Sequence, residues 1–259
     1  MYEKKITTQS FDELIGTAAT KKVCEFTLQV CELKTRQPNL PIPHLVLSMP
    51  PGEGFTTIAA TVADTLFQSH VVKTPHSLSR FLDYEVSEED TDLGGLNELL
   101  REASSITNAY DGIIACDLKV SLHHLKPEYL IRVLKEQQAL WILRVSPADL
   151  SGLIPYLRRS GRDFQILRLP ALTERELAEI ALKNYHGTEQ LISSESAEIL
   201  VSGLKKYECT SLHCINTALN DMFFQNNGKV MERTDVQKYI KNVADLHSEM
   251  TKNTIGFTR

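Results

Sequence analysis

Long apolar segments are missing from this sequence. No stretch approaches the roughly 18 apolar residues that a membrane-spanning helix needs. The first ten residues, MYEKKITTQS, contain no apolar core of a signal peptide. We therefore expect a cytoplasmic protein without a membrane partner.

Cysteine and glycine are also scarce. The five cysteines form no CxxC pair and no regular spacing, which argues against a disulfide framework or a zinc site and predicts reduced, mostly buried thiols. They are Cys24, Cys31, Cys116, Cys209 and Cys214. Glycine accounts for 12 of the 259 residues, about 5% against a usual share of roughly 7%.

Basic residues are in the minority. The chain has 33 acidic and 28 basic side chains and a net charge of −5, which argues against a protein whose whole surface binds nucleic acid. Binding of nucleic acid would therefore require a local basic patch. The 42% apolar and 24% charged content excludes a disordered or low-complexity chain.

Short apolar runs alternate with helical patterns over the first 170 residues. The strand candidates are 44–49, 70–73, 112–118, 139–145 and 164–170. The helix candidates between them are 56–68, 93–107, 127–138 and 149–159. This alternation predicts an α/β fold in which a parallel, five-stranded sheet has helices on both faces.

Only helical patterns follow Pro170. They cover 173–185, 194–207, 210–224 and 234–250. Thr173 and Glu176 form a predicted capping box at the start of the first of these helices. The sequence therefore predicts an α/β domain over 1–170 and an all-helical domain over 171–259.

The segment 49–57, MPPGEGFTT, places a glycine-containing turn between a strand and a helix. That arrangement binds phosphate, because backbone N–H groups and the helix dipole point at the anion. The segment resembles the Walker A loop of the AAA+ ATPases, GPPGxGKT. The matching positions are Pro50, Pro51, Gly52, Gly54, Thr56 and Thr57.

Three positions of this loop depart from the family pattern. Met49 stands where the first glycine would be, and Glu53 adds an acid that would repel phosphate. Phe55 replaces the lysine that supplies a positive charge to the β- and γ-phosphates. We expect Phe55 to pack into the space of the phosphates or onto the helical domain. The alternative interpretation of the whole segment is a plain strand-to-helix turn.

Other segments resemble the same family in the same order. Residues 10–16 resemble its entry segment, and the strand at 112–118 stands in the Walker B place. There Asp117 matches the metal-orienting aspartate, whereas Leu118 replaces the catalytic glutamate and cannot polarise a water molecule. Ser146 falls near the sensor-1 position.

The segment 154–170, IPYLRRSGRDFQILRLP, resembles the arginine-finger region of the family. Arg159 and Arg162 match the finger positions, and an arginine finger stabilises charge on the nucleotide of a neighbouring subunit. The alternative is a solvated basic turn. His213 is the nearest match to the sensor-2 arginine, and a neutral imidazole replaces a guanidinium poorly.

The resemblance to AAA+ P-loop NTPases covers roughly residues 10–225. Within that family, the first part looks like the Holliday-junction branch-migration motor and 139–185 looks like red-type Rubisco activases. The resemblance implies a nucleotide-binding-type domain over 1–170 with a helical lid over 171–259. It assigns nucleotide contacts to Pro51, Gly52, Glu53, Gly54, Phe55, Thr56, Thr57, Asp117, Ser146 and His213. Thr56 and Asp117 would also hold Mg²⁺.

The pattern of losses and retentions indicates a degenerate module with little or no ATP hydrolysis of its own. It would serve as a structural or regulatory subunit beside other AAA+ subunits, with Arg159 or Arg162 directed at a neighbour. The implied cofactor is none, or weakly bound ATP or ADP with Mg²⁺. Two alternatives stay open: a divergent ATPase, and an interaction module with a closed nucleotide cleft.

Overall fold

The computed structural model describes residues 11, 14, 16–72, 81–86, 113–118, 127–136, 139–184, 191–207, 209 and 211–254. The chain divides into two compact units, Met1–Ala171 and Leu172–Arg259. The predicted boundary lies one residue before this division. The helix expected at 93–107 lies outside the described residues, as does most of the entry segment.

The first unit is built on a parallel sheet with the strand order β2-β3-β4-β1-β5. Its strands are β1 His44–Ser48, β2 Phe81–Val86, β3 Ile113–Leu118, β4 Leu140–Val145 and β5 Phe164–Arg168. Strands β1, β3 and β4 are buried almost throughout, as expected for continuous apolar runs covered on both sides. The prediction of an α/β fold on a parallel sheet is confirmed.

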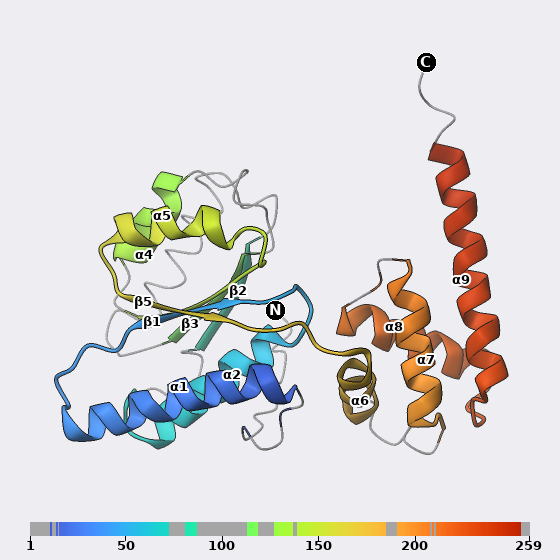
Figure 1. The fold of residues 1–259 in the computed structure, drawn as a ribbon, viewed down its shortest axis with the longest axis horizontal. Helices are drawn as coiled ribbons and strands as arrows, with labels where there is room; N and C mark the ends of the chain where they lie inside the picture. The colour runs from blue at the N-terminus through green and yellow to red at the C-terminus, as the bar shows by residue number, and fades with distance from the viewer. Residues whose placement is uncertain are drawn as a thin grey trace. The chain divides into compact units, whose positions relative to one another are not determined.

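Helices cover both faces of this sheet (Figure 1). Helices α1 Thr17–Arg36 and α2 Phe55–Gln68 lie on one face, and α4 Pro127–Glu136 and α5 Leu150–Ser160 lie on the other. Since side chains alternate along a strand, each face has its own apolar core: one cluster joins the sheet to α1 and α2, the other to α4 and α5. Consecutive residues of β3 and β4 therefore belong to opposite cores.

The strand predicted at 70–73 is wrong. Val71 and Val72 donate their backbone N–H groups to the carbonyl of Leu66, at 2.8 and 3.3 Å, and His70 has a φ of 55°. These residues close the last turn of α2, and the backbone groups that a strand would offer to a neighbour are used there. The strand beside β3 is β2, further along the chain.

The second unit consists of α6 Glu174–Asn184, α7 Ser194–Lys205, α8 Leu212–Gln225 and α9 Arg233–Thr254. They share one apolar core. The predicted capping box is present, because Glu176 N donates to Thr173 Oγ1 at 3.2 Å and Thr173 N donates to Glu176 Oε2 at 2.9 Å. A side chain at Gly203 in α7 would collide with Ile240 in α9, so this glycine permits close helix packing.

The cysteines correct one expectation. Cys209 and Cys214 form a disulfide, with Cα atoms 5.8 Å apart, a separation within the usual range. The bridge joins the α7–α8 connection to the first turn of α8, where Cys214 N donates to the capping hydroxyl of Ser211 at 3.2 Å. Cys31 and Cys116 are buried free thiols, and Cys24 is half-buried. No helix in the described part of the chain could span a membrane.

Candidate functional site

The segment 49–57 leaves the end of β1 at the carboxyl edge of the sheet and enters the first turn of α2. Met49 N donates to the carbonyl of Val145 in β4 at 3.1 Å, which fixes the start of the loop. Gly52 and Gly54 have φ values of 75° and 85°, in the left-handed region that favours glycine. Ile58 N donates to the carbonyl of Gly54 at 3.0 Å and begins α2. The turn geometry thus accounts for the glycines that this loop retains.

Phe55 is the first residue of α2 and is only 4% exposed. It belongs to the core cluster of α1, α2 and the sheet, together with Leu47 and Met49. A buried phenyl ring stands where the Walker A loop, which this segment resembles, carries a lysine. This position therefore offers no positive charge to a phosphate. Glu53, close by in the loop, is 8% exposed and is part of the loop's interior.

The other loop positions are less enclosed. Pro51 and Gly52 are exposed, and Thr56 and Thr57 are half-buried. Thr57 is tied into α2 because its carbonyl accepts from Thr61 Oγ1 at 2.9 Å. The two buried side chains of the segment 51–57 are thus Glu53 and Phe55, an acid and an apolar group, and neither carries a positive charge.

Asp117 lies near the carboxyl end of β3, in register with Arg144 on β4. Arg144 Nε donates to Asp117 Oδ1 at 2.5 Å, and Arg144 Nη2 forms an ion pair with the same oxygen. The Arg144 side chain is 1% exposed and that of Asp117 is 12% exposed. Arg144 was not among the residues predicted from the sequence, although one arginine inside the apolar run LWILRV is a visible anomaly.

Leu118 and Ser146 are each engaged by local structure. Leu118 is 3% exposed and packs in the core of α4 and α5, on the opposite face of β3 from Asp117. Ser146 Oγ donates to Asp149 Oδ2 at 2.6 Å and accepts from Asp149 N at 3.1 Å. Its hydroxyl therefore stabilises the turn into α5.

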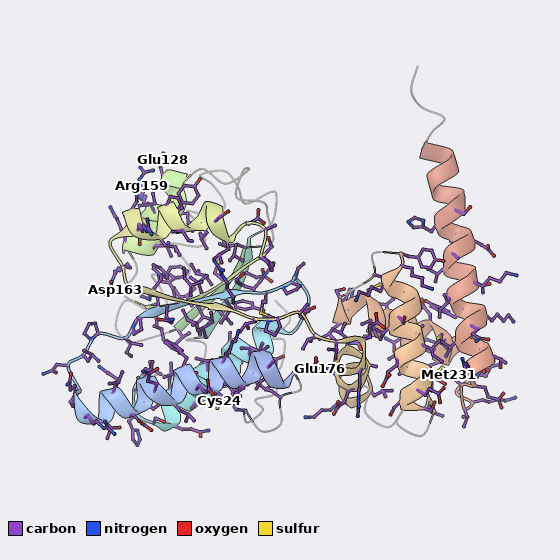
Figure 2. All side chains as sticks on the ribbon, in the orientation of Figure 1. Cys24, Glu128, Arg159, Asp163, Glu176 and Met231 are labelled. Carbon is purple, nitrogen blue, oxygen red and sulfur yellow. A yellow bond between two sulfur atoms is a disulfide. The ribbon has the colours of Figure 1, made fainter. Side chains whose placement is uncertain are left out.

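The two predicted finger arginines have different surroundings. Arg159 is exposed on the last turn of α5 (Figure 2). Arg162 is half-buried, and its Nη2 donates to the carbonyl of Lys135 in α4 at 3.0 Å. Gly161, with a φ of 70°, ends α5 between them. Arg162 therefore joins α4 to the start of β5, whereas Arg159 points its charge outward.

His44 is a buried titratable residue at the amino edge of the sheet. Its Nδ1 accepts from the backbone N–H of Trp141 at 3.0 Å, and its ring packs against Phe164. Burial, and secondly the charge of Arg162, lower the pKa of His44 from 6.5 to about 4, while Asp163 acts in the raising direction. A neutral imidazole is consistent with Nδ1 acting as an acceptor.

The topology sorts the predicted site residues into three places. Parallel strands end at one edge, so the loop 49–57, Asp117 and Ser146 share the carboxyl edge of the sheet. Arg159 and Arg162 precede β5 and lie toward the opposite, amino edge. His213 is exposed in the first turn of α8, in the second unit.

No protein-family model and no curated protein sequence matches the chain. Solved structures do match. The Holliday junction branch migration motor RuvB of Thermotoga maritima is 20% identical, with a TM-score of 0.58, and the match covers 91% of this chain and 72% of RuvB.

Two replication proteins match in the same way. Domain III of the Thermotoga maritima replication initiation protein DnaA is 15% identical, with a TM-score of 0.58, over 90% of this chain and 95% of that domain. The ORC2 protein of Aeropyrum pernix, in ADPNP–ADP complexes, is 15% identical, with a TM-score of 0.58, over 89% and 70%. All three are AAA+ P-loop ATPases, and the chain has their fold.

Proposed function

We propose that this chain is an AAA+-type module with little or no ATP hydrolysis of its own, which acts as a structural or regulatory subunit of an oligomer. The observation that carries the proposal is the burial of Phe55. At 4% exposure within the core, this side chain leaves the loop without the cation that positions the β- and γ-phosphates. A rotamer change cannot restore that charge.

Two further positions that would support hydrolysis within one subunit carry side chains that cannot do so. Leu118 is apolar and faces the α4–α5 core, so it cannot act as a general base. The Ser146 hydroxyl is engaged by Asp149. Each of these features alone would slow hydrolysis, and they occur together along one edge of the sheet.

Arg159 supports a role toward a neighbouring subunit. Its guanidinium is exposed and lies away from the carboxyl edge that holds the chain's own loop. A guanidinium supplied from one subunit to the nucleotide of another can raise the rate by about 10³ to 10⁵. Arg162 contributes differently in this proposal: its bond to the Lys135 carbonyl holds the turn that presents Arg159.

The test combines the chain with a catalytically active AAA+ partner and measures the ATPase rate of the mixture. We expect Arg159→Ala to lower the rate by at least about tenfold, a threshold set below the 10³ to 10⁵ that an arginine finger can contribute. Arg158→Ala is the matched control, because Arg158 is also exposed on the last turn of α5 and should leave the rate unchanged. Equal rates for the wild type and a doubly substituted Arg159→Ala, Arg162→Ala chain would sink the proposal.

A second candidate is nucleotide binding without hydrolysis. The left-handed Gly52 and Gly54 keep the backbone of a phosphate-binding turn. The space beside Gly54 is open, since no atom beyond its chain neighbours lies within 4 Å of the place where a β-carbon would stand. Titration with a fluorescent ATP analogue tests it. Micromolar binding that Thr56→Ala abolishes would support this candidate, and the absence of any thermal shift with ATP or ADP would favour the closed interaction module.

A further inference from the structure

A buried ion pair links the neighbouring strands β3 and β4 near the carboxyl edge of the sheet. Asp117 on β3 and Arg144 on β4 are register partners, and they lie on the face of the sheet that α1 and α2 cover. Their strand positions, two residues after Ala115 and Ile142 of the α1–α2 core, give this orientation. The hydrogen bond from Arg144 Nε to Asp117 Oδ1 measures 2.5 Å.

The environment of Arg144 makes this partnership compulsory. The side chain is 1% exposed, and a guanidinium stays charged at every pH that a folded protein tolerates. A buried charge is costly unless a counter-charge and hydrogen bonds compensate it. Its register partner on the other side is the apolar Leu47. Asp117 therefore has a structural task, which is to neutralise Arg144.

This task conflicts with the metal site that the family resemblance implies. Mg²⁺ would be held by the hydroxyl of Thr56 and the carboxylate of Asp117, since carboxylate oxygens are preferred ligands of Mg²⁺. Oδ1 of Asp117 already accepts from one nitrogen of Arg144 and contacts a second. A dication at this carboxylate would meet the guanidinium charge in a largely desolvated place, where repulsion is strong.

Among the residues that the structure describes, no group of three or more His, Cys, Asp or Glu side chains is arranged to hold a metal ion. Because the carboxylate of Asp117 is paired with Arg144, Asp117 and Thr56 do not fit a divalent cation.

We propose that Arg144 is the permanent counter-ion of Asp117 in place of a divalent cation, so that this edge of the sheet is closed to Mg²⁺. The inference rests on the proposed function, because it takes the loop 49–57 as a degenerate nucleotide site. It also specifies that site: any nucleotide bound by the loop is bound without a metal ion at Asp117.

The first experiment measures binding of Mn²⁺, a paramagnetic probe for Mg²⁺ sites, to the full chain by electron paramagnetic resonance. We expect the wild type and Asp117→Asn to bind Mn²⁺ equally, because the Asp117 carboxylate is already paired with Arg144. Saturable binding by the wild type that Asp117→Asn weakens by about tenfold or more would overturn the proposal.

The second experiment removes the counter-ion. Arg144→Met should bind Mn²⁺ at least about tenfold more tightly than the wild type. The doubly substituted Asp117→Asn, Arg144→Met chain should lose this gain. Arg144→Lys keeps a positive charge beside Asp117, so this variant should bind Mn²⁺ no more tightly than the wild type. A folded Arg144→Met chain without any gain would show that the guanidinium does not close the site. If either single variant fails to fold, the comparison of the wild type with the doubly substituted chain decides, because that chain carries neither buried charge. Equal Mn²⁺ binding by the two supports the proposal, and saturable binding that only the wild type shows overturns it.

The two proposals fail in separate measurements. A wild-type chain that hydrolyses ATP, with Mn²⁺ binding independent of Asp117, overturns the proposed function and leaves this inference intact. A wild-type chain without ATPase activity but with Mn²⁺ binding that depends on Asp117 overturns this inference alone.

Discussion

The predicted site residues at the two edges of the sheet differ in burial and in charge pairing. At the carboxyl edge, Phe55 is buried in the core and Asp117 is neutralised by Arg144. At the amino edge, Arg159 keeps its charge in solvent. Phe55 and Asp117 are thus held by packing and by an ion pair, while Arg159 stays accessible.

Among the substitutions that test this contrast, we expect disruption of the Asp117–Arg144 ion pair to have the largest effect. Arg144→Met leaves Asp117 without its counter-charge in the interior, and we expect it to lower the free energy of unfolding by about 4 kcal/mol. Chemical denaturation measures this. Asp117→Asn combined with Arg144→Met should recover most of the loss. A loss below about 1 kcal/mol, typical of exposed pairs, would show that the pair is not buried in solution.

Phe55 gives the next largest expected effect. Phe55→Ala removes a core side chain and should lower the free energy of unfolding by about 3 to 4 kcal/mol, measured by the same denaturation. Thr56→Ala is the matched control, since Thr56 is the next residue and only half-buried. If both substitutions have equally small effects, Phe55 is not a core residue and the carboxyl edge is more open than its packing implies.

The amino edge should show its own pH dependence through His44. Its folded pKa of about 4 lies below the ordinary 6.5, so its contribution to stability is full above pH 6.5 and is lost as the pH falls toward 4. The difference corresponds to about 3 kcal/mol. Denaturation at about pH 7 and about pH 4.5 measures it. His44→Asn retains an acceptor for Trp141 N–H and should flatten this part of the profile; an unchanged profile would remove His44 as the cause.

Arg159 should have the smallest effect on stability. Arg159→Ala removes an exposed side chain, and we expect a change within about 0.5 kcal/mol, measured by denaturation beside Arg162→Ala. The latter should cost more, about 1 kcal/mol, because it removes the hydrogen bond to the Lys135 carbonyl. The reverse order would exchange the structural and outward-facing roles of the two arginines.

Much of the fold could be predicted because local patterns agree with it. The apolar runs that became β1, β3, β4 and β5 are distinct, and each is bounded by a turn or helix signal. The strand expected at 70–73 failed because His70 turns the chain and Leu66 accepts both valine N–H groups. Such capping depends on backbone conformation, which the letters VV do not reveal. Helix α1 was not predicted, although 17–36 is continuous helix.

In the candidate site, too, some features could be predicted from the sequence and others depend on the folded structure. The absent groups are readable from the order of residues without any coordinates: position 55 has no lysine and position 118 has no glutamate. The glycines that shape the loop are readable in the same way, since only glycine adopts their left-handed conformation readily. Whether a position carries a charged group, and whether its backbone can adopt a positive φ, depends on the identity of one residue. The sequence alone is therefore sufficient to predict both.

The use of the remaining groups depends on the folded chain. Asp117 and Arg144 are 27 residues apart in the chain, and parallel pairing of β3 and β4 brings them into register. Arg159 and Arg162 are close neighbours in the sequence, yet the turn at Gly161 exposes one and ties the other to α4. Charge pairing and exposure arise from contacts between distant segments, because the surroundings of a charge are fixed only when its neighbours are in place.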